Sequence, residues 1–258
     1  MSPIRMVAVL LGLAAGMYVA AVLMLYFKQR SLVFYPQFTR SPSVPPEFRF
    51  DVEGAVLRGW VVNPGQERAL LYFGGNGEDI SLNRDDVPRW FPDHTVYLVS
   101  YRGYGHSSGQ PSEQAMVGDA FALFDFVAKS HRTVDALGRS LGSGVATQVS
   151  AARPVGRLAL ITPFDSLLRV AQGHYPWVPM RWLLADRFES WVLAPQLTMP
   201  VLVVIAAQDD VIPPPHSEAL ISLLPNPPQV LRLPLAQHST VQVYPEYDAA
   251  LRQFFSVE

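Results

Sequence analysis

The stretch that decides the fold is Val134-Asp135-Ala136-Leu137-Gly138-Arg139-Ser140-Leu141-Gly142-Ser143-Gly144. It contains Gly-x-Ser-x-Gly, preceded by an apolar, β-prone run and followed by small residues that suit a helix. In this strand–turn–helix context the motif predicts a nucleophile elbow centred on Ser140. Glycines two residues to either side leave room around a serine held in a sparsely populated backbone conformation. A plain Gly/Ser turn is the alternative, so the rest of the chain must decide.

Length and composition favour one large core. The chain has 258 residues, 49% of them hydrophobic, and α/β chains of this size often form a single domain. A formal charge of −2 provides no basic surface, which argues against a nucleic-acid partner. The chain has no cysteine, so disulfides, thiolate catalysis and cysteine metal sites are excluded.

The N-terminus reads as a membrane anchor. Residues 6–27 carry no charge and are long enough to cross a bilayer core of ~30 Å. A cleaved signal peptide is the competing interpretation, with Val19-Ala20-Ala21 as the cleavage site. The apolar run continues for six residues beyond that point, whereas cleavable apolar regions are shorter. We therefore expect an uncleaved single-pass anchor, and the flanking charges leave its orientation in the membrane open.

The remaining chain alternates strand and helix patterns. A hairpin is expected over 48–62, around Glu53-Gly54. Strands are expected over 69–73 and 95–100, both buried, and over 133–137, 158–161, 201–206 and 230–233. Helical spacing occurs over 80–91, 114–129, 145–152, 217–224 and 247–255. This alternation predicts an α/β fold with an open, mostly parallel central sheet and helices on both faces. The expected organisation is an anchor over 1–30, an extended proline-rich linker over 31–47 and one domain over 48–258, with a short helical cap inserted at about 163–194.

Sites in such sheets gather at the carboxyl ends of the strands. A serine nucleophile needs a base and an orienting acid, and with this elbow they follow in the order Ser, acid, His. Asp209 and Asp210 come just after one late strand, and His238 just after the last one. Spacing alone does not choose between the two aspartates. His174 and His216 do not follow strands, so we expect them on the cap surface and at a helix N-terminus.

The developing oxyanion needs backbone donors. One is expected from Leu141, at the start of the elbow helix, and the other from Asn76, in the loop after the 69–73 strand. Glycines at 74, 75 and 77 let that loop approach a substrate. Phosphate binding is a weaker alternative, because Gly-Gly-Asn-Gly lacks both G-x-G-x-x-G and the Lys-[Ser/Thr] of a P-loop. No His/Asp cluster has metal-ligand spacing, so neither a metal nor another cofactor is expected.

Several motifs together resemble the serine α/β-hydrolases, and more narrowly the BEM46-like group, which includes the membrane-anchored ABHD13-type and ABHD17-type proteins. The matching stretches are Gly75-Asn76-Gly77-Glu78-Asp79, Tyr101-Arg102-Gly103-Tyr104-Gly105-His106-Ser107, the Ser140 pentapeptide, Thr162-Pro163-Phe164-Asp165-Ser166, Asp209-Asp210-Val211-Ile212-Pro213-Pro214 and His238. The resemblance implies an α/β-hydrolase domain over 48–258, with Asp209 as the acid. Two positions depart from the family pattern: Gly74 replaces a histidine that props the oxyanion loop, and Ser100 replaces an aspartate before Tyr-Arg-Gly.

The predicted function is a membrane-anchored serine hydrolase that cleaves an acyl ester or thioester through Ser140, His238 and Asp209. A lipid-like substrate is suggested by the anchor and by cap aromatics such as Tyr175, Trp177 and Trp182; the alternative is that these aromatics form the core of the cap. An amidase or aminopeptidase runs on the same triad, and the sequence does not separate these reactions. The alternative of a different functional class is a binding module with the same fold and no catalytic activity. Such inactive members of the fold family typically lack one residue of the triad. The sequence indicates no oligomeric state.

Overall fold

The computed structural model describes residues 2–39 and 45–256, and its centre is a twisted eight-stranded sheet within those residues. The strand order is β1-β2-β4-β3-β5-β6-β7-β8. Strand β2 is antiparallel to both of its neighbours, β1 and β4, and β3 to β8 run parallel to one another. The strands are β1 (Phe48–Val52), β2 (Ala55–Val62), β3 (Arg68–Phe73), β4 (His94–Val99), β5 (Thr133–Arg139), β6 (Leu158–Ile161), β7 (Val201–Ala206) and β8 (Gln229–Leu233).

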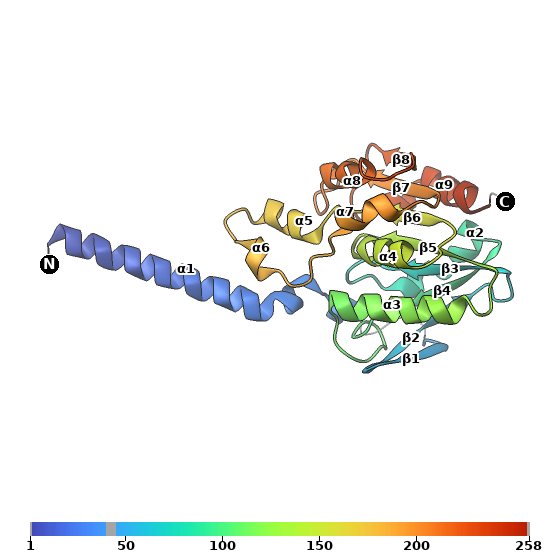
Figure 1. The fold of residues 1–258 in the computed structure, drawn as a ribbon, viewed down its shortest axis with the longest axis horizontal. Helices are drawn as coiled ribbons and strands as arrows, with labels where there is room; N and C mark the ends of the chain where they lie inside the picture. The colour runs from blue at the N-terminus through green and yellow to red at the C-terminus, as the bar shows by residue number, and fades with distance from the viewer. Residues whose placement is uncertain (1, 40–44, 257–258) are drawn as a thin grey trace.

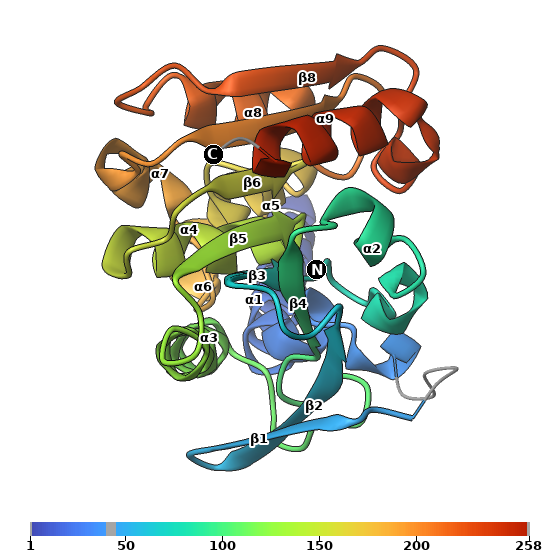
Figure 2. The same cartoon turned by 90° about the vertical axis from the view of Figure 1, so that its right-hand side faces the viewer.

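The inner strands β3 to β7 are buried on both sides because helices cover both faces of the sheet, whereas the edge strands β1 and β8 are partly exposed. In β3, Ala69, Leu71 and Phe73 enter one core, while Leu70 and Tyr72 enter the other. This is the two-residue period of a strand buried on both faces. Figure 2 shows α3 and α4 on one face and α2 and α9 on the other.

The α-helices of the described residues are α1 (Pro3–Val33), α2 (Val87–Trp90), α3 (Glu113–Val127), α4 (Leu141–Ala152), α5 (Leu167–His174), α6 (Met180–Leu183), α7 (Ser190–Leu193), α8 (Pro214–Ile221) and α9 (Pro245–Ser256). Short 3₁₀ helices lie at η1 (Pro36–Thr39), η2 (Ile80–Asn83), η3 (Ala194–Gln196) and η4 (Val241–Val243). The expected hairpin and parallel strands are confirmed, and α5, α6 and α7 occupy the expected cap insertion.

Two local expectations were wrong. The continuous helix over 80–91 is instead η2, a turn and the single turn α2, because Pro88 lacks an N–H and cannot continue a helix from upstream. The linker is also less extended than its prolines suggested: α1 continues to Val33 and Pro36–Thr39 is a 3₁₀ helix. Residues 40–44 of that linker lie outside the described residues.

The helix α1 stands apart from the domain. It has 31 residues, none of them buried, and its apolar stretch is long enough to cross a membrane. Figure 1 shows it extending from one end of the domain, with the cap helices α5 and α6 beside its C-terminal half. Most side chains of α1 therefore have no protein to pack against, and this helix is a candidate membrane anchor.

Candidate active site

The elbow between β5 and α4 has the geometry that its glycines predict. Ser140 adopts φ 51° and ψ −118°, a left-handed conformation that is strained for a non-glycine residue. A Cβ on Gly142 would lie 2.0 Å from the Phe73 carbonyl oxygen, and one on Gly138 would lie 2.4 Å from the Gly142 carbonyl oxygen. Only glycine fits at either position, because both contacts are with rigid backbone.

A line of hydrogen bonds connects Ser140, His238 and Asp209. Ser140 Oγ lies 2.8 Å from His238 Nε2, and His238 Nδ1 lies 2.7 Å from Asp209 Oδ2. A carboxylate only accepts, so Nδ1 carries the hydrogen and Nε2 is left to accept from the serine hydroxyl. These are the contacts that general-base activation of a serine requires.

The structure distinguishes the two candidate acids. Asp209 is 6% exposed, and its Oδ1 accepts hydrogen bonds from the backbone N–H groups of Val211 (3.0 Å) and Ile212 (2.7 Å). Those two bonds hold the carboxylate in place with Oδ2 turned to the imidazole. Asp210 is exposed to solvent. The geometry therefore favours Asp209 as the residue that orients His238.

The loop after β3 lies against the elbow and is held there by Glu78. A Cβ on Gly75 would lie 3.6 Å from Ser140 Cβ. The Gly75 N–H is occupied, since it donates to Glu78 Oε2 at 2.5 Å. The other Glu78 oxygen accepts from Tyr72 and lies 3.4 Å from Arg139 Nη1. Burial, reinforced by the charge of Glu78, raises the pKa of Tyr72 well above its ordinary value, so its hydroxyl remains a donor.

The occupied Gly75 amide leaves the next amide, that of Asn76, as the loop's candidate oxyanion donor. The second candidate is Leu141 N–H, which belongs to the first turn of α4, where amides have no intrahelical partner. Glu78 was absent from the predicted site. Glu78 stands three residues after Gly75, and a side chain at that spacing can reach back to a turn amide. This spacing was the indication of its role in the sequence.

The Asn76 side chain ties the oxyanion loop to the end of α1. Its Nδ2 donates to the Val33 carbonyl at 2.6 Å, and its Oδ1 accepts from Tyr35 N at 2.9 Å and from Tyr104 Oη at 2.7 Å. Burial raises the pKa of Tyr104, which keeps its hydroxyl protonated. Phe34, between the two tethered residues, is 1% exposed and belongs to the domain core. The segment that follows the candidate anchor is thus part of the site's support.

The two departures from the family pattern lie beside one small cavity. Gly74 and Ser100 both line a cavity of about 10 Å³ behind the oxyanion loop. The loop does not lack support, because Tyr101 Oη donates to the Gly74 carbonyl at 2.9 Å and Glu78 holds the next amide. Contacts from other side chains thus support the loop where the family has a histidine.

A second histidine–carboxylate pair lies at the base of the cap. His216 Nδ1 is 2.7 Å from Asp165 Oδ1, and Arg169 donates to Asp165 Oδ2 at 2.7 Å. Burial opposes the ionisation of Asp165, but the hydrogen bonds from His216 and Arg169 outweigh it and lower its pKa. The pair joins the start of α8 to the segment that opens the cap. His174 is on the cap, as expected, and contacts the Val211 carbonyl.

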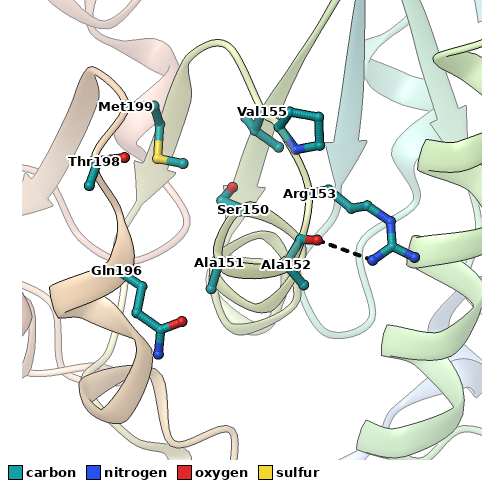
Figure 3. A pocket seen from close by; sticks show the side chains of 9 residues that line it. Ser150, Ala151, Ala152, Arg153, Val155, Gln196, Thr198 and Met199 are labelled. Carbon is teal, nitrogen blue, oxygen red and sulfur yellow. Dashed lines mark hydrogen bonds between the residues drawn. The ribbon is translucent and has the colours of Figure 1, made fainter.

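Another hollow, of about 400 Å³, lies at the opposite edge of the sheet (Figure 3). It is bounded by the end of α4 and by the segment that leads into β7, and its lining includes no His, Asp or Glu. It therefore offers no general base or acid. Within the described parts of the chain, no three His, Asp or Glu side chains are grouped so that they could hold a metal ion.

The fold and the elbow define an α/β hydrolase. No protein-family model matches the chain. It is 32% identical over 248 residues to an uncharacterized protein of Mycobacterium tuberculosis, covering 90% of this chain and 87% of the relative. It is also 26% identical over 230 residues to protein bem46 of Schizosaccharomyces pombe, covering 77% and 76% of the two chains. The chain belongs to the α/β-hydrolase superfamily and is of the BEM46-like type.

The fold is also similar to solved hydrolase structures. The crystal structure of the enol-lactonase from Burkholderia xenovorans superposes with a TM-score of 0.65 at 16% identity, covering 81% of this chain and all of the lactonase chain. At this identity the similarity concerns the fold alone.

The choice of acid is testable by paired substitutions. Asp209→Asn should lower kcat by roughly 10³–10⁴-fold, because the amide no longer holds the imidazole in the required tautomer. Asp210→Asn, the matched change at the neighbouring exposed residue, should alter kcat by no more than about twofold. Steady-state kinetics on a chromogenic ester compare the two variants. A large loss in Asp210→Asn with activity retained in Asp209→Asn would reverse the assignment.

The role of the Asn76 side chain is testable separately from its backbone. Asn76→Ala keeps the amide but removes the bonds to Val33, Tyr35 and Tyr104, so kcat should fall about 10–100-fold while KM changes little. Asn226→Ala, which removes a single exposed bond to the Thr198 carbonyl, is the control and should match the wild type. Thermal unfolding of each variant identifies any general loss of stability. A normal kcat in a folded Asn76→Ala variant would rule out positioning by this side chain.

Proposed function

We propose that the protein is a membrane-anchored serine hydrolase that cleaves an acyl ester or thioester through an acyl-enzyme intermediate. The observation that carries the proposal is the hydrogen-bonded line from Ser140 through His238 to Asp209, placed on a strained elbow at the carboxyl edge of the sheet. A catalytically silent relative typically lacks one residue of the triad. Here all three residues are present, and His238 lies within hydrogen-bond distance of both Ser140 and Asp209.

Each residue has one role in the proposed reaction. Ser140 Oγ attacks the acyl carbonyl carbon while His238 Nε2 takes its proton. The N–H groups of Asn76 and Leu141 bind the oxyanion, and Asp209 stabilises the imidazolium that forms. His238 then protonates the departing alcohol or thiol. A water molecule, deprotonated by the same imidazole, attacks the acyl-serine and releases the acid.

An ester or thioester of an acyl chain is the proposed substrate. The apolar helix α1, as a candidate membrane anchor, supports this choice. The cap packs on the elbow helix through Phe188, which is fully buried and lies within about 3 Å of a Cβ position on Gly144.

Hydrolysis assays across leaving groups test this function. The full-length protein in detergent should hydrolyse p-nitrophenyl esters and acyl thioesters, with Ser140→Ala reducing the rate to background, a loss of roughly 10⁶-fold. Matched p-nitroanilides test the amidase alternative. A faster reaction on the anilides would change the substrate class, and no turnover of any substrate by folded protein would overturn the hydrolase proposal.

A further inference from the structure

The cap lies along the candidate membrane anchor and is bonded to it at three places. Tyr18 Oη donates to the Trp177 carbonyl at 3.0 Å, and the Ala185 N–H donates to Gln29 Oε1 at 2.7 Å. Arg30 Nε contacts Asp186 Oδ2 at 3.3 Å. Figure 1 shows the α5–α6 portion of the cap reaching back from the domain beside α1.

The contact at Tyr18 falls inside the apolar stretch that would cross the bilayer. The whole of α1 is about 46 Å long at 1.5 Å per residue, longer than a bilayer core of ~30 Å requires. If residues 6–25 fill that core, Tyr18 lies seven residues from its near edge, about 10 Å below it. Trp177 shares that depth, because it is bonded to Tyr18. Interfacial elements typically insert their apolar face ~5–10 Å, so the required depth is ordinary.

The surface of the cap suits that location. Tyr175, Trp177 and Trp182 are 52%, 63% and 82% exposed, although large aromatic side chains usually bury most of their area in a soluble domain. No Asp or Glu occurs from Leu167 to Ala185, and Arg181 stands beside Trp182. Exposed Trp and Tyr with a neighbouring basic residue are typical of protein surface at the level of lipid headgroups.

We infer that residues 175–182 of the cap form a second membrane-contacting element, seated in the lipid leaflet that receives the C-terminal half of α1. The partner is a lipid surface, because the cap patch is continuous with a helix long enough to span one. The inference rests on the anchoring part of the proposed function. It deepens that proposal by naming the substrate class: an acyl compound that partitions into the bilayer and reaches Ser140 from the lipid side.

The catalytic edge of the sheet opens toward the same end of the molecule. The oxyanion loop is tied to α1 through the bonds from Asn76 to Val33 and Tyr35. The cap begins directly after β6, at the carboxyl edge of the sheet, and His174 of the cap contacts the Val211 carbonyl, two residues after Asp209. Anchor, cap and triad therefore lie at one end of the domain, so a molecule dissolved in the leaflet need not cross open water to reach the serine.

The absence of cysteine makes the placement directly measurable. Full-length protein is reconstituted in phosphatidylcholine nanodiscs with a single cysteine, carrying an NBD fluorophore, introduced by Trp182→Cys. Leu13→Cys, within α1, is the control for the bilayer core, and Gln253→Cys, at a solvent-exposed position of α9, is the control for solvent. Quenching by lipids brominated near the headgroup is compared with quenching by lipids brominated deep in the chain. All measurements are made on the Ser140→Ala background, so they do not depend on activity.

The label at 182 should be quenched at least about threefold more than the label at 253, and more by shallow than by deep bromines. The native tryptophans provide a second measurement: bromolipid quenching should fall in a Trp177→Phe/Trp182→Phe double variant, because Trp60 and Trp90 are buried and Trp191, at 36%, is much less exposed than the two that are replaced. A label at 182 that behaves like the label at 253 would overturn the inference, as would shielding of that label without bromine quenching, which indicates a protein partner or a second copy.

The controls separate this inference from the proposed function. If the label at 182 is quenched but the wild-type protein hydrolyses no substrate, the inferred membrane contact stands and the proposed enzymatic function is rejected. If the label at 13 is not quenched, α1 does not enter the bilayer, and both the proposed anchor and this inference are rejected.

Discussion

The arrangement of the site depends on one close backbone contact, between Gly142 at the start of α4 and the Phe73 carbonyl at the end of β3. A side chain at position 142 would lie 2.0 Å from that oxygen, so the helix can approach the strand only because the residue is glycine. The approach brings the start of α4 beside the loop that follows β3. Leu141 N–H, Ser140 Oγ and the Asn76 backbone can then surround a single substrate carbonyl. The strain at Ser140 is maintained because packed strands and helices on both sides fix the turn.

The sequence predicted what backbone spacing and strand order control. Alternating patterns identified the parallel strands, and the order Ser140, Asp209, His238 followed from the requirement that each residue end a different strand. The contacts that support these residues were not predicted, because they depend on side chains that meet only in the folded chain. Glu78 holds the Gly75 amide, and His216 pairs with Asp165 across 51 residues of sequence. Periodicity carries no information about such pairings.

The N-terminal segment shows the same limit. Its apolar length indicated a membrane helix, but the boundary predicted between anchor, linker and domain does not match the contacts. Phe34 is buried in the core of the domain, and Asn76 binds the backbone on both sides of it. These few bonds connect α1 to the oxyanion loop, while Tyr18, Gln29 and Arg30 connect it to the cap. The candidate anchor α1 is thus joined at two places, the loop after β3 and the cap, to the end of the domain that carries the candidate site.

We propose that Ser140 is the nucleophile that the fold activates. This role can be measured by mass spectrometry of peptides from the folded, full-length protein after treatment with a fluorophosphonate. We expect one phosphonyl adduct, on the peptide that contains Ser140, and its loss in His238→Ala because the base is gone. An adduct on another residue, or an unmodified Ser140 peptide from folded wild-type protein, would contradict it.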